Sequence, residues 1–391
     1  MKKFIALLLA LAMVFALAAC GSKTAESPAE SKAPAESGTP ALDASSIKIG
    51  VVMIGDESDK GYNYNHVLGI KEMQKALGIS DEQIIYKANV PEGSECEAAI
   101  RELCEAGCNI IFANSFGFET YMVEVAPDYP DIQFCHATGY LSASDDLENT
   151  HNYFAAIHEA RYLAGIAAGM KTQNNHLGYV AAKPFAEVIS GFTAFYLGAK
   201  SVNPDVTMDV IYTNEWSDAT KEAQAAQALI DKGCDVISQH SDTTAPATTA
   251  QTAGVWQVGY NADMTEAAPE ASLISARINW GVYYTYAVKT LLEGGKIDQD
   301  WCKGLADGAV SLTPLNTKIA AEGTQEAIDK ASAEIVAGTR HVFAGPLKGK
   351  GTDATGAEKS IDIPEGDYFR EGEASSAPAW YYIIDGINVI R

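Results

Sequence analysis

The sequence predicts an α/β fold built from two halves with one plan. Short apolar runs alternate with amphipathic stretches of helical length, which is the pattern of parallel strands joined by helices. The segments around Cys108 and Cys234 are alike, since each places a glycine and a cysteine directly before an apolar run. A glycine at that point is typical of the end of a helix. We therefore expect two αβ halves that join near residues 150–160.

The expected strands are the short apolar runs of the chain. They comprise residues 47–54, 83–88, 110–114, 133–137, 177–181, 207–212, 236–239, 256–260 and 273–278. The expected helices lie between them, where the pattern is amphipathic. They comprise residues 65–77, 95–106, 158–170, 187–202 and 219–232. One glycine-rich segment, 345–351, resembles a phosphate-binding loop, but its proline and the lack of a following helix predict a turn.

Residues 1–20 have the pattern of a bacterial lipoprotein signal peptide. Lys2 and Lys3 precede an apolar run that is too short to span a bilayer and that ends in small residues. The last four residues, Leu-Ala-Ala-Cys, resemble the lipobox, whose cysteine receives lipid and begins the mature protein. We expect lipidation at Cys20, with a transmembrane anchor or a signal cut without lipid as the alternatives.

Residues 21–45 are predicted to be a disordered tether. Ser, Ala, Pro, Glu and Gly dominate this stretch, and it has too few large apolar side chains to form a core. Such a coil would reach roughly 25–30 Å from a membrane. Residues 46–391 are long enough for two domains. We assign 46–155 to the first and 156–281 to the second, and expect part of about 282–391 to return to the first.

The chain is strongly acidic, with a formal net charge of −23. Such a surface argues against nucleic acid or anionic lipid as a partner. Beyond Cys20 the sequence has six cysteines: Cys96, Cys104, Cys108, Cys135, Cys234 and Cys302. We expect buried thiols, with a disulfide, or a metal site at the Cys104-x-x-x-Cys108 spacing, as the alternatives.

The candidate site lies where the expected strands end, because ligands of open α/β sheets bind beyond the carboxyl ends of the strands. These ends carry aromatic rings and Asn, Ser, Thr, His and Asp side chains but few cations. A phosphate or carboxylate ligand would call for arginine or a glycine-rich nest. Aromatic faces with hydrogen-bonding groups beside them suit a planar, neutral, nitrogen-bearing ligand. The candidate ligand-binding residues are Asp59, Tyr62, Asn63, Ser115, Phe116, His136, Thr138, Trp216, His240, Asp242, Asn261 and Asp263.

No familiar catalytic motif is found in the sequence. It lacks Gly-x-Ser-x-Gly, His-Glu-x-x-His, the Walker motif, and a Gly-x-Gly-x-x-Gly after the first strand. We therefore expect a protein that is not an enzyme and that needs neither cofactor nor metal. Asp56, Glu57 and Asp59 form an acidic cluster near a strand end that suits a metal ion, so a secreted nucleoside hydrolase-like enzyme is the less favoured alternative.

Several longer motifs between Ile47 and Gly295 resemble those of a single family. They lie at residues 59–63, 125–131, 159–165, 197–204, 232–237 and 259–263. On these residues the chain resembles the basic membrane protein family of ABC-transporter substrate-binding lipoproteins, whose best-known type is a purine nucleoside receptor. The resemblance implies a two-lobed periplasmic-binding-protein type I clamp, each lobe a parallel sheet flanked by helices. It also implies capture without chemistry, ABC permease subunits as partners, and a lipid-anchored position outside the bacterial cytoplasm.

Carried over residue by residue, the resemblance implies an aromatic-Asn pair after the first strand, which here is Tyr62-Asn63. A second aromatic ring follows a strand of the other lobe, here Trp216, so that the two rings would hold a purine between them. Closure would bring Trp216 and His240 across the ligand. The residues expected to read the edge of the ligand are Asn63, Ser115, His136 or Asp263.

The ligand that the resemblance implies is a purine, with free adenine first. Nucleoside-binding members have an Asp after the fourth strand, an Asp early in a Gly-x-Asp-x-Asp turn and a Lys near the last shared strand. This chain has Thr138, Asn261 and roughly Ile278 there, so the charged groups that would hold ribose hydroxyls are missing. The segments that resemble the adenine-binding branch are 61–66, 136–140 and 239–242. A nucleoside, a sugar or a signalling molecule is the alternative.

Overall fold

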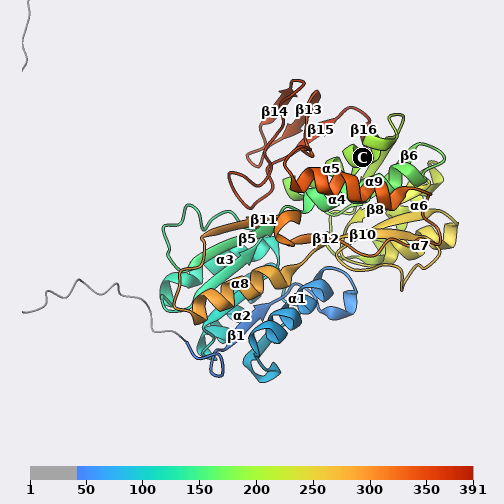
Figure 1. The fold of residues 1–391 in the computed structure, drawn as a ribbon. Coiled ribbons are helices and arrows are strands. Elements are labelled where there is room, and N and C mark those ends of the chain that lie inside the picture. The colour runs from blue at the N-terminus through green and yellow to red at the C-terminus, as the bar shows by residue number, and fades with distance from the viewer. Residues whose placement is uncertain (1–41, 391) are drawn as a thin grey trace, which may run out of the picture. The chain divides into compact units, whose positions relative to one another are not determined.

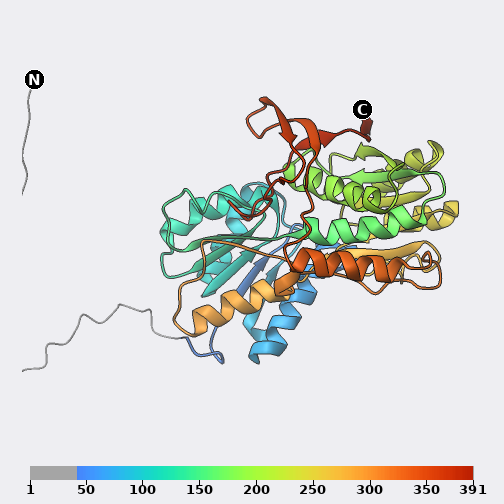
Figure 2. The ribbon, with the colours of Figure 1, turned by 45° about the horizontal axis from the view of Figure 1, so that its top comes forward.

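The computed structural model describes residues 42–390, whose helices and strands are shown in Figures 1 and 2. The expected signal peptide at 1–20, with Cys20, lies outside the described residues, as does most of the expected tether at 21–45. These assignments therefore stay predictions. Within the described part of the chain, no helix has the length and apolar character that a membrane span requires.

The first sheet has six parallel strands in the order β11-β5-β4-β3-β1-β2. The strands are β1 (Ile49–Val52), β2 (Ile84–Lys87), β3 (Ile110–Ala113), β4 (Gln133–Ala137), β5 (Thr150–Ala155) and β11 (Asp300–Lys303). The helices that accompany them are α1 (Tyr62–Leu77), α2 (Ser94–Glu105), α3 (Glu119–Val125) and α8 (Trp280–Leu292). Short 3-10 helices lie at Glu57–Asp59, Asp81–Gln83, Phe116–Phe118 and Ala126–Asp128. We call this sheet and its helices the first lobe.

The second sheet has seven strands in the order β12-β10-β9-β8-β6-β7-β16, and β12 at its edge runs antiparallel to the rest. The strands are β6 (His176–Ala181), β7 (Thr207–Tyr212), β8 (Val236–His240), β9 (Trp256–Tyr260), β10 (Ser272–Ile278), β12 (Val310–Leu312) and β16 (Ile387–Ile390). The helices that accompany them are α4 (Ile157–Lys171), α5 (Ala186–Val202), α6 (Ala219–Asp231), α7 (Ala245–Ala253) and α9 (Thr324–Val336), with a 3-10 helix at Leu305–Asp307. We call this sheet and its helices the second lobe.

A small third sheet follows α9. Its antiparallel strands are β13 (Leu347–Thr352), β14 (Glu358–Ile363) and β15 (Tyr382–Ile384), in the order β14-β13-β15. Figure 1 shows this sheet beside α5. The turn predicted at 345–351 is wrong, because Leu347–Thr352 pairs with a strand on each side. The lysines of β13 are exposed and Gly349 is its one buried residue, so no apolar run marks the strand in the sequence.

The chain crosses between the two lobes three times. It passes from β5 to α4, back from β10 to α8, and again from β11 to β12. Thus α8 and β11 complete the first lobe although they follow the second in the sequence, whereas β12, α9 and β16 belong to the second. Few backbone segments connect the lobes, and such connections let two rigid bodies rotate by small changes in dihedral angle.

Burial explains why the central strands form where the sequence predicts them. Every residue of β1, β3 and β8 is buried, since helices cover both faces of each parallel sheet. The predicted α/β class is confirmed, and the predicted strands and helices are found with shifts of at most three residues at their ends. The patterns did not predict β5, α3, α7 or any of the helices and strands that begin after residue 278.

The six cysteines of the described residues are free thiols. Five are buried and Cys302 is half-buried. Burial raises the pKa of the thiols of Cys96 and Cys135 to about 12, so both stay protonated at neutral pH. The expectation of buried thiols therefore agrees with five of the six positions.

Helices α4 and α5 pack so closely that a side chain at Gly198 would overlap the carbonyl oxygen of Tyr162. In a helix interior, alanine is normally about 1 kcal/mol more favourable than glycine. We nevertheless expect Gly198→Ala to lower the free energy of unfolding by about 1–3 kcal/mol, because the two helices must move apart. Urea unfolding followed by circular dichroism measures the change. A variant as stable as the wild type would show that α4 and α5 separate without cost.

Candidate ligand-binding site

A narrow cavity lies between the lobes, at the carboxyl ends of the central strands of both sheets. Its walls come from Ile54, Tyr62, Asn114, Ser115, Phe116 and Thr138 in the first lobe and from Glu187, Trp216, His240, Asp242 and Tyr260 in the second. Its free volume is about 20 Å³, which is room for roughly one water molecule. A larger ligand therefore enters only when the lobes separate or the side chains move. We call this the cleft cavity.

Tyr62, at the start of α1, forms part of the first-lobe wall. Its hydroxyl donates a hydrogen bond to the backbone carbonyl of Asn114. Its ring meets His66 edge-on at 4.5 Å and Trp280 edge-on at 6.3 Å between ring centroids. These contacts hold the ring at the cavity in one orientation. Burial raises the pKa of Tyr62 well above its ordinary value, so the phenol stays neutral.

The loop before α1 is held by Asp59 and Asn63. The Asp59 carboxylate accepts four hydrogen bonds at 2.8–3.0 Å from Gly61, Asn63 and Tyr64, and so caps the helix. The Asn63 oxygen accepts from the Gly55 backbone at 3.3 Å and from the Asn114 amide at 2.9 Å. Both side chains are thus occupied by the protein, and neither is part of the cavity wall.

The end of β4 brings His136 and Thr138 to the first-lobe side. His136 donates from Nε2 to the Ser115 carbonyl at 2.7 Å, and burial lowers the pKa of the imidazole, so the ring is neutral. It lies behind the wall rather than in it. Thr138 lines the cavity with φ of 67°, a left-handed conformation that is uncommon for threonine and that often marks a functional position.

On the second-lobe side, His240 ends β8 and lies in a buried polar cluster. Its Nε2 donates to Glu187 at 3.2 Å, and its ring lies 4.7 Å from that of Tyr260. Burial lowers the pKa of His240, and the Arg161 cation lowers it further, whereas Glu187 opposes the shift. The Arg161 guanidinium lies 3.5 Å from the centroid of the Tyr260 ring and donates to the Gln239 carbonyl at 2.6 Å.

Asp242 differs from the other residues of the cavity wall because it is a buried carboxyl without a hydrogen-bond donor in the described chain. The residue is 4% exposed, and no group among residues 42–390 donates a hydrogen bond to its carboxylate. Burial raises its pKa well above the ordinary value near 3.8, and the neighbouring acids Asp59 and Glu222 raise it further. A carboxyl in this position is either protonated or paired with a donor that occupies the cavity.

Several buried polar atoms of the wall also have no partner within the described chain. They are Thr138 Oγ1, Trp216 Nε1, His240 Nδ1 and the Tyr260 hydroxyl. Buried polar groups without a hydrogen bond are costly, so a cluster of them indicates a place for a polar ligand or for water. Asn261 is also buried without a partner and has φ of 69°, but it lies outside the cavity wall.

Contacts between the lobes close the cavity. Lys183 of the second lobe forms an ion pair with Glu92 of the first at 3.3 Å, and its ammonium lies 5.2 Å from the Trp216 ring. A side chain on Gly61 would overlap the backbone carbonyl of Asp242. The two backbones therefore touch, and only glycine at position 61 permits this approach.

The structure brings most of the predicted residues together. Those in the cavity wall are Tyr62, Ser115, Phe116, Thr138, Trp216, His240 and Asp242, and those outside it are Asp59, Asn63, His136, Asn261 and Asp263. Asp263 is exposed and accepts from Thr265 at 2.6 and 2.9 Å, in a separate surface hollow. Sequence reasoning did not select Ile54, Asn114, Glu187 or Tyr260. Asn114 and Tyr260 stand at strand ends, so the same rule would have found them.

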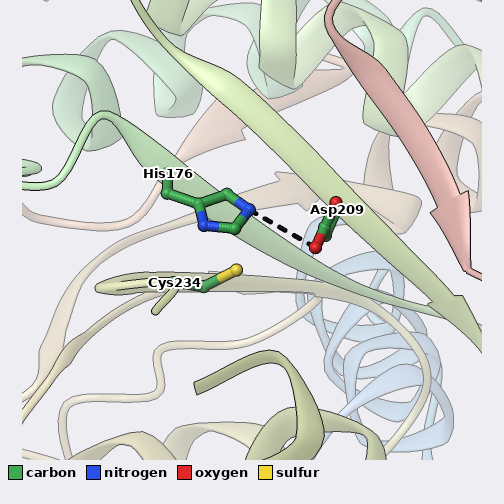
Figure 3. Close-up of side chains that lie close together, drawn as sticks. All are labelled: His176, Asp209 and Cys234. Atoms are coloured by element: carbon green, nitrogen blue, oxygen red, sulfur yellow. Dashed lines mark ion pairs between the residues drawn. The ribbon is translucent and has the colours of Figure 1, made fainter. Parts of the chain in front are cut away.

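One cluster elsewhere has side chains of metal-ligand type. The ligand atoms of His176, Asp209 and Cys234 lie within 4.8 Å of one another, as Figure 3 shows. Each already has a protein partner: His176 pairs with Asp209 at 3.4 Å, Asn388 donates to Asp209 at 2.8 Å, and the Cys234 thiol donates to the Leu177 carbonyl at 3.3 Å. These residues lie toward the amino-terminal ends of β6, β7 and β8. The cleft cavity lies at the carboxyl ends of the strands, so the cluster is not part of it.

The acidic cluster that the hydrolase alternative requires is engaged in loop structure. Asp56 accepts hydrogen bonds from the Ser58 hydroxyl, from Asn89 at 2.8 Å and from the Ser58 backbone at 2.9 Å, and these bonds lower its pKa to about 2. Asp59 caps α1, and Glu57 pairs with Lys71 at 3.7 Å. These carboxylates therefore already have partners within the loop and its neighbours.

Comparison with known proteins shows which family and which relatives this chain resembles. Residues 46–341 match the family model described as ABC transporter substrate-binding protein PnrA-like. A purine-binding protein of Brucella abortus (strain 2308) is 37% identical over 302 residues, which is 77% of this chain and 84% of the relative. A putative ABC transporter glucose-binding protein of Haloferax volcanii is 37% identical over 287 residues, 72% of this chain and 70% of the relative.

Among solved structures, a solute-binding protein of an ABC transporter system from Aeropyrum pernix K1 has a TM-score of 0.66 at 18% identity. The likeness covers 77% of this chain and 94% of that one. At this identity it shows the fold alone. The expected type I periplasmic-binding-protein architecture is confirmed.

Asp242→Asn tests the carboxyl of the cavity wall. When folding raises the pKa of a group, that group contributes to the free energy of unfolding at low pH. This contribution is lost as the pH rises from the pKa of the unfolded state through that of the folded state. Between about pH 4 and pH 7, the free energy of unfolding of the variant should therefore rise relative to that of the wild type. Urea unfolding at several pH values measures the difference, with the exposed Asp263→Asn as the control. If the difference in free energy of unfolding between the variant and the wild type does not change with pH, the pKa of Asp242 is not raised by folding.

Proposed function

The chain belongs to the family of PnrA-like ABC transporter substrate-binding proteins, and on this premise we propose that it captures a free purine base, adenine first. The observation that carries the proposal is the wall of the cleft cavity. It combines aromatic rings from both lobes, polar atoms without a partner in the described chain, and the unpaired carboxyl of Asp242. A flat heteroaromatic ring with hydrogen-bonding groups along its edge meets all three features.

The charges of the cavity wall support a base rather than an anionic ligand. Neither Lys nor Arg is among the wall residues, whereas Glu187 and Asp242 supply carboxyl oxygens. Such a wall suits a ligand whose N–H groups donate hydrogen bonds to these carboxyl oxygens. Adenine offers an exocyclic amino group and a ring N9–H. A nucleoside lacks the second donor, because its sugar is bonded at that nitrogen.

The substitutions at three positions also favour a base. Thr138 is the residue of the three that lines the cavity, and it carries no charge. Asn261 and Ile278 are buried and uncharged as well. The chain therefore has no charged side chain at these positions to hold ribose hydroxyls.

The proposed mechanism is capture by closure. In the open form each lobe presents half of the site, with Tyr62 on one side and Trp216 on the other. A ligand drives closure only in so far as it binds the closed form more tightly than the open form. The closed protein would deliver its ligand to ABC permease subunits. We propose that this takes place outside the cytoplasm, with lipid on Cys20 holding the protein to the membrane.

A sugar is the second candidate, and one observation favours it. The Haloferax relative is named a putative glucose-binding protein, and aromatic rings with carboxylates also suit a pyranose. The neutral imidazole of His240 and the unpaired indole N–H of Trp216 can form hydrogen bonds with the ring nitrogens and amino group of a heterocycle. A sugar, which has only hydroxyl groups, does not need these two groups.

Calorimetric titration tests the proposal. The protein without residues 1–20, freed of bound ligand by unfolding and refolding, is titrated with adenine, guanine, hypoxanthine, adenosine, guanosine, ribose and glucose. We expect submicromolar binding of a free base and much weaker binding of nucleosides. Tight nucleoside binding would overturn the argument from Thr138, Asn261 and Ile278. Binding of glucose without purine binding would favour the second candidate.

Trp216→Ala removes one of the aromatic rings that the second lobe brings to the cavity. Stacking of a base on an aromatic side chain contributes about 1–3 kcal/mol, so we expect adenine affinity to fall about 5- to 150-fold. Thermal unfolding should change little, because Trp216 is only half-buried. Trp256→Ala, at the first residue of β9 and away from the cavity, is the matched control. Equal affinity in the variant and the wild type would exclude stacking on Trp216.

Gly61→Ala tests closure itself. The added methyl group would overlap the backbone carbonyl of Asp242, so the lobes cannot reach the closed position. We expect affinity for adenine to fall at least about tenfold with unchanged urea stability. Small-angle scattering should show that adenine compacts the wild type and the control Gly93→Ala but not this variant. Compaction of all three would show that the lobes do not meet at Gly61.

A further inference from the structure

A second and larger cavity adjoins the cleft cavity. It has a volume of about 490 Å³ and is lined by Phe116, Thr138, Tyr140, Pro184, Phe185, Ala186 and Glu187 from the two lobes and by residues 352–355, 375, 377–379 and 381 from the chain after α9. We call it the outer chamber. Its volume falls within the usual range of small-molecule sites, roughly 300–1,000 Å³.

The outer chamber and the cleft cavity share part of their walls. Phe116, Thr138 and Glu187 line both. These three side chains therefore lie between a ring bound in the cleft cavity and the space of the outer chamber. A group attached to that ring reaches the chamber when the three side chains let it pass.

The outer chamber is apolar and aromatic. Phe116 lies 5.0 Å from Phe185 and 6.5 Å from Tyr140, measured between ring centroids. Tyr140 is 53% exposed, the highest value among the large hydrophobic residues that are exposed in the described chain. Asp353 brings a carboxylate to the rim, but Thr355 and Ala357 donate to it at 2.6–3.0 Å. Such a wall suits a hydrocarbon or aromatic group and not a ribose or a phosphate.

The wall contributed by the end of the chain is anchored to both lobes. The Ser376 backbone donates to Asp300 of β11 at 2.9 and 3.1 Å, which attaches the segment to the first sheet. The Trp380 ring stacks on Phe343 at 4.5 Å, and β16 then pairs with β7 of the second sheet. This part of the chain lies beyond residue 341, where the family match ends. Figure 2 shows its strands beside the helices of the second lobe.

We infer that the site accepts a purine that bears an apolar substituent, with the ring in the cleft cavity and the substituent in the outer chamber. The inference rests on the proposed function, since it needs the purine ring to occupy the cleft cavity. It adds that the last part of the chain takes part in specificity. Each buried methylene strengthens binding about fourfold, so a substituent of benzyl size strengthens it at least about tenfold over adenine.

The test is calorimetric titration of the protein without residues 1–20 with adenine, N6-benzyladenine and 8-benzyladenine, both of which keep the ring N9–H. We expect at least one of the benzyl compounds to bind about tenfold or more tightly than adenine. In Ala377→Trp, whose indole would occupy part of the chamber and narrow it, this gain should shrink or vanish while adenine affinity stays within about twofold. Tyr140→Ala, a change at an exposed residue, should reduce the gain in affinity without affecting folding. Tyr86→Ala, at an exposed residue of β2, is the control and should leave the gain unchanged.

The outcomes separate the inference from the proposed function. If adenine binds and both benzyl compounds bind more weakly than adenine, the outer chamber does not take the substituent and only the inference fails. The inference also fails if the gain is present but neither Ala377→Trp nor Tyr140→Ala reduces it. If no purine binds to the wild-type protein, the proposed function fails and the inference fails with it.

Discussion

The closed cavity depends on a contact between two backbones, at Gly61 in the first lobe and at Asp242 in the second. Because no side chain of Gly61 intervenes, the separation of the lobes is set by the loops that carry these residues. Asp59 holds the first of these loops through its four hydrogen bonds. The cap of α1 and the contact between the lobes are therefore one structural unit. This gives Asp59 a positioning role in a place where the sequence suggested a direct contact with ligand.

The second requirement is to keep carboxyl groups in a buried cavity without unfolding the protein. Unpaired buried charges are costly, and a nearby opposite charge offsets part of this cost. Arg161 is buried beside His240 and Tyr260 on the inner side, and Lys183 lies at the junction of the lobes, paired with Glu92. In a chain with a net charge of −23, two cations thus lie close to the acidic wall. Lys183 pairs with Glu92 rather than with Asp242, so the Asp242 carboxyl has no cation partner within the described residues.

The sequence predicts those elements and residues whose environment repeats along the chain. The central strands are apolar because helices cover both faces of the sheets. The same rule did not predict β5, because the first residues of this strand are polar. Hydrogen bonds to specific partners compensate for the burial of these polar side chains. Asn152 donates to Glu119 at 2.9 Å, and His151 contacts Gln133 at 2.8 Å. For the site, the rule of strand ends selected residues that line the cavity. It did not find Glu187, which stands in the first turn of α5, and it selected Asp263, whose turn faces solvent. The packing of one lobe on the other decides both cases, and no local pattern contains it.

The pairing of β16 with β7 has a consequence for how the protein is made. Asn388 and Asp209, which join these strands by a hydrogen bond of 2.8 Å, are 179 residues apart. Contacts of such long range form slowly, and N-terminal parts of a chain fold first during synthesis. The edge of β7 thus stays unpaired until the last residues have emerged, and an unpaired strand edge is a template for aggregation. A chain that lost only its final strand would therefore tend to associate with its neighbours rather than fold as a slightly shorter protein.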